Sequence, residues 1–467
     1  MKLFSLAFRN ILRNKRRSVA TLSAMVLGVI TILIFGGFTR DIGYTLETGY
    51  VQRGGHLQLQ RKDYFLFGSG NPGAYGISDY KNSIELIKKD AVLGPMLTAA
   101  TPILQFGGVA GNFDQGVSRT VLVTGMDVDG QNILHKWNDY KTFQNPPLSV
   151  LTNTAPDTVL IGMGVARVLQ LCKALEVEPC PKQDIKAEET EKIPDDIAAL
   201  SEELTDTLKT DSGKSAPRIE LLAANTHGAP NVTGLNVKKA EAQGVKALDD
   251  VYVAMHLAQA QKLLFANETP KVSSIILQFN HTADLPRATQ RIAELINLKQ
   301  LGSAAEPLEV HDFTEIYPFY LQAKAMFKTI FGFISILIGS IVLFTVSNTM
   351  SMAVVERTVE VGTLRALGQR QSGILQLFLA EGLILGAVGA LSGIFISFLI
   401  AELINCSGIS WTPPGWINTV PFVVRIVGEY ELVSITAIAI STVAVISAWW
   451  PAKRAAKLNI TEALRHV

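Results

Sequence analysis

The sequence predicts an integral membrane protein with four transmembrane α-helices and a large mixed α+β extracytoplasmic domain inserted between helices 1 and 2. Two observations lead to this fold class. The chain has 467 residues and an ordinary hydrophobic share of 48%, but its apolar residues gather in four stretches that carry no charge. Residues 41–325, between the first and second stretches, are numerous enough to form two compact lobes.

Each uncharged stretch is long enough to cross a membrane as a helix, because about 20 residues span the ~30 Å hydrocarbon core. The stretches cover residues 18–39, 329–355, 382–401 and 432–452. One such stretch alone also fits a buried core helix, but four together indicate a membrane protein. We expect transmembrane helices at 18–40, 326–355, 372–403 and 431–452, with an outer loop at 404–430.

The distribution of Lys and Arg predicts that both termini face the cytoplasm. Residues 1–17 contain basic side chains and no acidic one. The segment after the second helix holds three more basic residues, Arg357, Arg365 and Arg370. The outer loop, in contrast, has only Arg425. We therefore expect residues 41–325 outside the cytoplasm, and the inner loop 356–371 and the tail 453–467 in the cytoplasm.

Residues 41–325 alternate between strand and helix patterns. Strands are predicted at 56–60, 119–123, 157–161, 219–223 and 250–254. A strand at 272–279, a helix at 284–298 and a strand at 308–311 follow as a predicted β-α-β unit. The region at about 173–217 is acidic and poor in large apolar side chains. We expect a flexible or weakly helical insertion there, because so little apolar surface cannot offset the entropy of ordering.

Cys172 and Cys180 lie near the start of this insertion. A disulfide between them is chemically permitted outside the cell. Two free thiols are the alternative, because spacing alone does not define connectivity. The third cysteine, Cys406, has no obvious partner.

Residues 1–17 predict an amphipathic helix that lies in the membrane interface. At 100° per residue, apolar side chains gather on one face of this helix, and Arg9, Arg13 and Arg16 lie on the opposite face. Such a helix suits the inner interface beside anionic lipid. The alternative is that the basic residues only set the orientation of the chain.

The inner loop 356–371 has the composition of a short docking helix. Its charged residues alternate in sign among apolar ones. We expect Gly362 to break the extension of the second transmembrane helix and Gly368 to cap the short helix. The residues predicted to couple this loop to a partner are Glu356, Arg357, Glu360, Gly362, Leu364, Arg365, Ala366, Leu367 and Gly368.

The third transmembrane helix carries a stripe of small residues, Gly382, Gly386, Gly389 and Gly393. Such a stripe allows close helix packing. A dimer seam and packing within one subunit are both consistent with it. Glu381 precedes the stripe and is expected at the headgroup layer rather than in a proton relay, because twenty uncharged residues follow it.

No catalytic, cofactor-binding or metal-binding residues are predicted, so the chain itself is not expected to be an enzyme. Its seven histidines lack metal-ligand spacing. Residues 212–215 resemble the end of a phosphate-binding loop, but Leu208 stands where that motif requires glycine. We find no nucleophile motif of the Gly-x-Ser-x-Gly or Cys-His kind.

The motif VERTVEVGTLRALG at 355–368 resembles the signature of the FtsX-like/MacB-like ABC transporter permeases, a mechanotransmission-type (type VII) family. EGLILG at 381–386, RNILRNKRR at 9–17 and PAKRAA at 451–456 continue this resemblance. The outer domain is most similar to the lipoprotein-releasing LolC/LolE-like permeases. That weaker similarity rests on residues 55–60, 123–127 and 161–166, and the acidic insertion departs from it.

The resemblance implies two permease subunits, identical or paralogous, that dock their inner loops on a dimeric cytoplasmic ABC ATPase. ATP and Mg would belong to that ATPase, with no cofactor in this chain. ATP binding would shift the first two helices and move the outer domains, so that lipoprotein, lipid or another amphipathic cargo is handled at the outer face. Membrane lipid and a periplasmic acceptor or lipoprotein are further implied partners, and no nucleic acid is expected.

A non-transporting regulator is the alternative. The same architecture would then relay the state of the ATPase to a periplasmic partner such as a cell-wall hydrolase.

Overall fold

The computed structural model describes residues 2–13, 15–142, 147–180, 217–266, 268–412 and 419–458. The predicted acidic insertion therefore lies mostly outside the described residues, as does the end of the predicted tail. The chain divides into two compact units. The first comprises residues 1–46, 318–411 and 420–467, and the second comprises residues 47–317 and 412–419.

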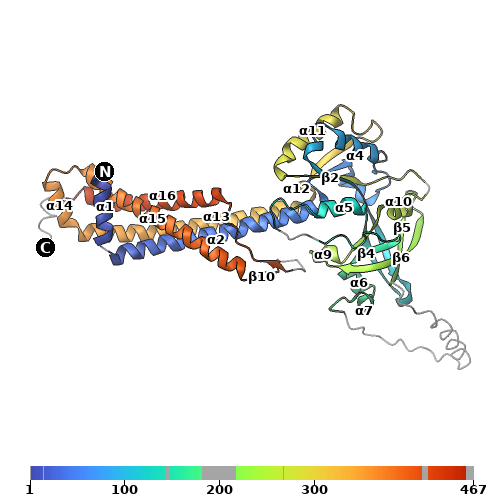
Figure 1. The fold of residues 1–467 in the computed structure, drawn as a ribbon, viewed down its shortest axis with the longest axis horizontal. Coiled ribbons are helices and arrows are strands. Elements are labelled where there is room, and N and C mark those ends of the chain that lie inside the picture. The colour runs from blue at the N-terminus through green and yellow to red at the C-terminus, as the bar shows by residue number, and fades with distance from the viewer. Residues whose placement is uncertain are drawn as a thin grey trace, which may run out of the picture. The chain divides into compact units, whose positions relative to one another are not determined.

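The first unit is helical (Figure 1). Its helices are α1 (Lys2–Arg13), α2 (Lys15–Gly54, which continues into the second unit), α13 (Pro318–Glu356), α14 (Thr358–Ala366), α15 (Gln371–Cys406) and α16 (Tyr430–Ala456). Four of them, α2, α13, α15 and α16, are long and apolar enough to cross a membrane. Each runs past the span expected from its uncharged stretch, because a charged residue ends the apolar run without ending the helix. At 1.5 Å per residue, the 40 residues of α2 extend about 60 Å.

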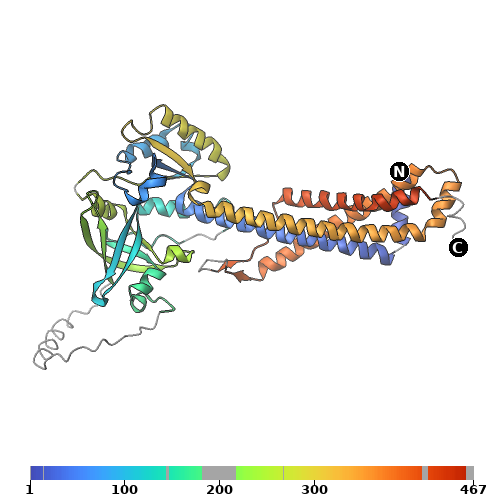
Figure 2. The ribbon, with the colours of Figure 1, turned by 180° about the vertical axis from the view of Figure 1, so that it is seen from behind.

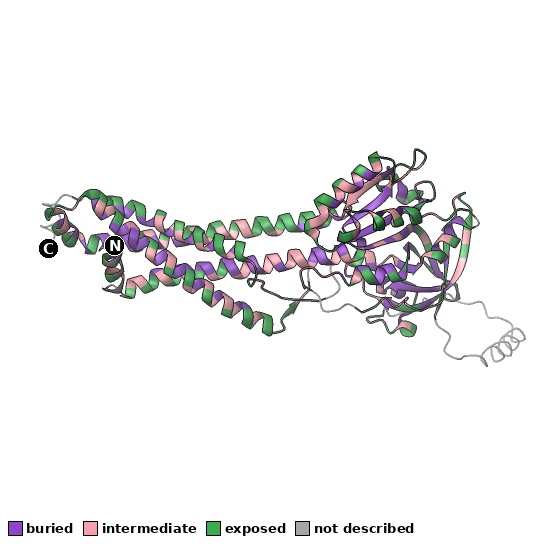
Figure 3. Cartoon of the chain, turned by 45° about the horizontal axis from the view of Figure 1, so that its top comes forward, coloured by how far each residue is buried: buried purple, intermediate pink, exposed green. Residues whose placement is uncertain are grey.

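The four long helices share a core of aliphatic and methionine side chains. Met25 and Leu33 of α2, Val346 of α13, and Ala444 and Ala448 of α16 are buried in this cluster. Figure 3 shows how exposed and half-buried residues cover much of the remaining helix surface. An apolar helix surface of this kind suits a lipid environment. A helix also suits it because its backbone groups form hydrogen bonds within the helix, where lipid offers none.

The second unit is built on nine strands. They are β1 (Leu57–Arg61), β2 (Leu97–Asn112), β3 (Val117–Met126), β4 (Thr158–Gly162), β5 (Arg218–Ala224), β6 (Pro230–Glu241), β7 (Tyr252–His256), β8 (Ser274–Phe279) and β9 (Leu308–Asp312). The strand order is β3-β7-β4-β6-β5-β2-β8-β1-β9, and β2 also pairs with β3. That extra pairing closes β2, β3, β7, β4, β6 and β5 into a six-stranded ring, which forms one lobe.

Alternate residues of the ring strands point into a common apolar core. Phe106, Val123, Ile161, Leu221 and Val253 are all buried in it. α10 (Leu257–Phe265) packs onto the same cluster with Leu263 and Leu264, among others.

The second lobe consists of β8, β1, β9 and the first part of β2, with α4 (Tyr80–Lys89) and α11 (Leu285–Asn297) packed on them (Figures 1 and 2). The predicted β-α-β unit is present as β8, α11 and β9, but its strands are not neighbours. β1 lies between them and is antiparallel to both. Strand β1 comes from before the unit in sequence, so local spacing carried no sign of the split.

Shorter elements connect these lobes and helices. They are α3 (Tyr64–Phe67), η1 (Gly68–Gly70), η2 (Gly94–Met96), η3 (Phe113–Gln115), α5 (Val128–His135), α6 (Met163–Val168), α7 (Cys172–Leu175), α9 (Lys246–Asp249), η5 (Thr282–Asp284), α12 (Phe313–Ile316), β10 (Ser410–Trp411) and β11 (Val420–Pro421).

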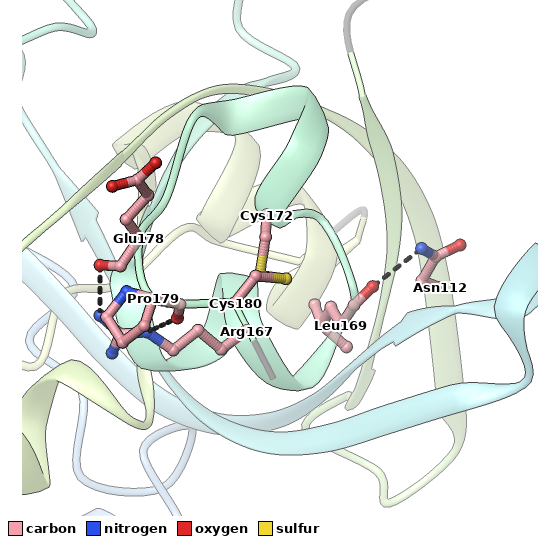
Figure 4. The surroundings of a disulfide bond; sticks show 7 residues. All are labelled: Asn112, Arg167, Leu169, Cys172, Glu178, Pro179 and Cys180. Carbon is pink, nitrogen blue, oxygen red and sulfur yellow. Dashed lines mark hydrogen bonds between the residues drawn. A yellow bond between two sulfur atoms is a disulfide. The ribbon is translucent and has the colours of Figure 1, made fainter. Parts of the chain in front are cut away.

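Cys172 and Cys180 form a disulfide at the edge of the ring lobe (Figure 4). Their Cα atoms lie 5.8 Å apart. Arg167 holds the same segment, because its Nε donates a 3.2 Å hydrogen bond to the carbonyl oxygen of Pro179. Cys406 is a free, exposed thiol.

Candidate functional site

The predicted inner loop folds as α14, which follows α13 after a break of one residue. α13 ends at Glu356 and α14 begins at Thr358, so the break falls at Arg357 rather than at Gly362 as expected. Gly362 lies buried inside α14. Glycine was expected at the break because of its backbone freedom, but the residue with non-helical dihedral angles is Arg357.

Gly368 closes the far end of α14. Its φ of 94° lies in the left-handed region that favours glycine. The amide of Gly368 donates to the carbonyl oxygen of Arg365 at 3.0 Å, and the amide of Gln369 donates to that of Leu364 at 3.1 Å. This pair of bonds is the Schellman arrangement, which satisfies carbonyl groups at a helix end.

One face of α14 packs against the ends of the long helices. Val361 is buried and Leu364 half-buried in a cluster with Phe378 of α15 and Ala452 of α16. Nη1 of Arg365 donates a 2.7 Å hydrogen bond to the carbonyl oxygen of Ala456. Three of the residues predicted to couple this loop to a partner, Gly362, Leu364 and Arg365, therefore pack within the chain and hold α14 in place.

The opposite face of α14 is exposed. The exposed residues along it are Val359, Glu360, Thr363, Ala366 and Leu367, together with Glu356 at the end of α13. Leu367 is 80% exposed and Val359 45% exposed. Val359 and Thr363 were not among the predicted residues, although the three- and four-residue spacing from Glu356 to Leu367 placed them on one helical face. The result is a short apolar row beside two carboxylates, which is suited to binding another protein.

Arg357 belongs to a buried polar group beneath this face. Its Nη1 lies 2.8 Å from Oε1 of Glu381, and their side chains are only 8% and 4% exposed. Nδ2 of Asn10 donates to the same carboxylate oxygen at 2.7 Å. Glu381 is thus held by two partners inside the protein. Its position at the headgroup layer stays a prediction. Its partners were not predicted, because the pairing of residues 24 positions apart cannot be read from local spacing.

Two further ion pairs connect α14 with the start of the chain. Arg13 pairs with Glu360, and Arg17 pairs with Glu356. Two of the predicted interfacial arginines, Arg9 and Arg16, are exposed. α1 lies against α15, where Ala7 is buried. The interfacial role of this helix stays a prediction.

The glycine stripe of α15 packs within the chain, and its first half faces α16. A methyl group added at Gly382 would lie 2.9 Å from Cβ of Ala448, and one added at Gly386 would lie 3.0 Å from Cβ of Ala444. The second half faces α2, since a methyl group at Gly389 would lie 2.8 Å from Cβ of Met25. Gly393 approaches Val29 in the same way, at 2.7 Å. Of the two alternatives for this stripe, the structure shows packing inside one subunit.

Within the described ranges, no group of three or more His, Cys, Asp or Glu side chains is arranged to hold a metal ion.

The segment that contains most of α13 and all of α14, α15 and α16 matches a known protein family. Residues 330–460 match the family described as FtsX-like permease C-terminal. The ABC transporter permease YtrF of Bacillus subtilis is 36% identical over 137 residues, which cover 29% of this chain and 30% of YtrF. An uncharacterized ABC transporter permease of Methanocaldococcus jannaschii is 27% identical over 217 residues, 46% of this chain and 51% of that protein. The macrolide export ATP-binding/permease protein MacB of Escherichia coli is 29% identical over 194 residues, 41% of this chain and 27% of MacB.

Four membrane-length helices and these matches define the class of the protein as a membrane permease. At the family level, residues 330–460 match the FtsX-like permeases, and the chain is similar to ABC transporter permeases of the FtsX/MacB type. It spans about half or less of the length of these curated relatives.

Proposed function

We propose that this chain is the permease subunit of an ABC transporter that couples ATP binding and hydrolysis by a separate ATPase to movement of residues 47–317. The observation that carries the proposal is the exposed face of α14. A short helix that keeps Leu367 and Val359 in solvent, while its other face is firmly packed, is suited to dock a protein partner. ATP and Mg would be bound by that partner.

We further propose that α14 and both termini face the cytoplasm and that residues 47–317 lie in the periplasm, with the chain in a bacterial inner membrane. The supporting observation is the basic character of the segments at the α14 end. Residues 1–17 have no acidic side chain, and Lys453 and Arg454 end α16. Basic segments next to membrane helices stay on the cytoplasmic side.

For the cargo, we propose lipoprotein, lipid or another amphipathic molecule, handled at the outer face of the membrane. The support is the resemblance of residues 55–60, 123–127 and 161–166 to lipoprotein-releasing permeases. A second permease copy or paralogue, membrane lipid and a periplasmic acceptor complete the proposed partners.

Affinity purification from native membranes in mild detergent, with mass spectrometry of the retained proteins, tests the proposal. The test variant is Leu367→Asp with Val359→Asp, which places charge in the apolar row without touching the packed face. Leu364 is not suitable, because it packs inside the unit. The matched control is Val427→Asp, since Val427 is 76% exposed but lies in the segment before α16.

An ATPase retained by the wild type and the control, and lost with the double variant, supports ATPase docking on α14. Absence of an ATPase from the wild type in several detergents contradicts the proposal. Co-purified lipoprotein or lipid supports transport, whereas a co-purified cell-wall hydrolase supports the regulatory alternative.

A further inference from the structure

Asn10, Arg357 and Glu381 form a closed ring, called here the clasp. They come from α1, from the residue between α13 and α14, and from α15. We propose that the clasp joins α1 and α14 into one rigid docking unit, so that α1 takes part with α14 in binding the ATPase. This inference rests on the proposed function and deepens it, because it adds a second element to the docking surface.

Each member of the clasp contacts the other two. Arg357 donates through Nη1 to Glu381 at 2.8 Å and through Nη2 to the backbone oxygen of Asn10 at 3.0 Å. Asn10 completes the ring by donating through Nδ2 to Glu381 at 2.7 Å. Because Arg357 donates to both Glu381 and Asn10, movement of α1 away from this site would leave one donor of the buried guanidinium without its acceptor.

The position of Arg357 between α13 and α14 allows the clasp to control the orientation of α14. It is the single residue between two helices, with φ −102° and ψ 16°, so its backbone sets the direction in which α14 leaves α13. The buried side chain fixes that backbone against α1 and α15. A displacement of α14 by a bound ATPase would therefore carry α1 with it.

Two ion pairs at the rim bring α1 and the start of α2 to the exposed face of α14. Arg13 reaches Glu360, and Arg17 reaches Glu356. Both glutamates belong to the exposed face that carries Leu367 and Val359. A partner that covers this face consequently meets Arg13, which is itself exposed.

The test uses the full chain and separates the clasp from ATPase docking. Asn10→Ala removes the side-chain hydrogen bond from α1 to Glu381. It leaves the Arg357–Glu381 pair and the bond from Arg357 to the backbone oxygen of residue 10 in place. Proximity of α1 to α14 is measured with Arg13→Cys and Glu360→Cys in a Cys406→Ser background, using a short bifunctional thiol cross-linker. The control on the same helix is Arg9→Ala, at an exposed position outside the clasp.

We expect the cysteine pair to cross-link in the otherwise unchanged chain and in the Arg9→Ala control, and less so in Asn10→Ala. We expect Asn10→Ala to retain about tenfold less ATPase, the effect of losing one hydrogen bond to a charged group. Cross-linking before solubilisation should restore retention, which a folding defect would not allow. Cross-linking and ATPase retention that are unchanged by Asn10→Ala would overturn the inference. Failure of the wild type to retain any ATPase would instead count against the proposed function, while the cross-linking yields still report on the clasp.

Discussion

The backbone amide of Phe279 donates a 3.1 Å hydrogen bond to Nδ1 of His56, a fully buried histidine in the second unit. Nδ1 is therefore the unprotonated nitrogen. Nε2 carries the proton and lies 3.2 Å from Oγ1 of Thr282. Both ring nitrogens are thus engaged in the neutral form, and a second proton would break the bond from Phe279.

His56 should make the protein less stable in mild acid. Burial lowers the pKa of His56 to about 3, below the ordinary histidine value. In the unfolded chain His56 therefore becomes protonated below about pH 6.5. In the folded chain it becomes protonated only below about pH 3. The stabilisation is complete above pH 6.5 and falls by up to ~1.4 kcal/mol per pH unit below it.

Thermal unfolding of the full chain in detergent between pH 4 and pH 7 checks this prediction. His56→Gln, which does not titrate, should show a shallower decline in melting temperature than the wild type. Parallel profiles of the two proteins would contradict the assignment of the decline to His56.

Val361 and Val359 form a matched pair on α14, because Val361 is 3% exposed and Val359 is 45% exposed. Val361→Ala should lower the free energy of unfolding by about 2 kcal/mol, since it removes two buried methyl-sized groups. Val359→Ala should change it by less than about 0.5 kcal/mol. Melting curves measure the stability of the two variants. In the affinity purification, Val359→Ala should retain less ATPase than Val361→Ala.

Gly389 and Gly393 should not tolerate a side chain. Gly389→Ala places a methyl group 2.8 Å from Cβ of Met25, so α2 and α15 must separate. We expect destabilisation of about 1–3 kcal/mol, as for other overpacked cores. Gly332→Ala on α13 is the control, since nothing lies within 4 Å of an added Cβ. That variant should be neutral or slightly stabilising, because Ala favours helix over Gly.

Cys180→Ser should destabilise the ring lobe. The disulfide closes a loop with a sequence separation of 8 between Cys172 and Cys180. The entropy of closing a loop of this length corresponds to about 2–3 kcal/mol. Cys406→Ser should leave the melting temperature unchanged. Addition of a reductant should lower the melting temperature of the wild type toward that of Cys180→Ser, and a wild type insensitive to reductant would count against the bond.

The elements that could be predicted were those with a signal in the local sequence pattern. Four uncharged stretches gave the four long helices, and alternating residues gave strands such as β1 and β5. Strand β2 escaped prediction, because Pro102 and the glycines at 107, 108 and 111 read as turn signals rather than strand. Its pairing with three other strands outweighs those preferences.

The candidate site was predictable in place but not in the role of each residue. The alternation of charge around residues 356–368 located α14, and left-handed Gly368 could be expected from its position. Arg357 and Leu364 looked like surface residues of a docking helix, yet both turn inward. Their partners, Glu381 and Phe378, are distant in sequence, so only the tertiary structure separates the packed face from the exposed one.

Strand β2 limits how the two lobes of the second unit can move relative to each other. Its first part pairs with β8, and the part from Ile103 onward pairs with β3. One uninterrupted strand of 16 residues thus belongs to both lobes. A clamshell closure of the lobes would have to bend this strand and break ladder hydrogen bonds on its two sides. The two lobes should therefore move as a single rigid body, so that the cargo proposed above would be displaced by the whole domain rather than held between its lobes.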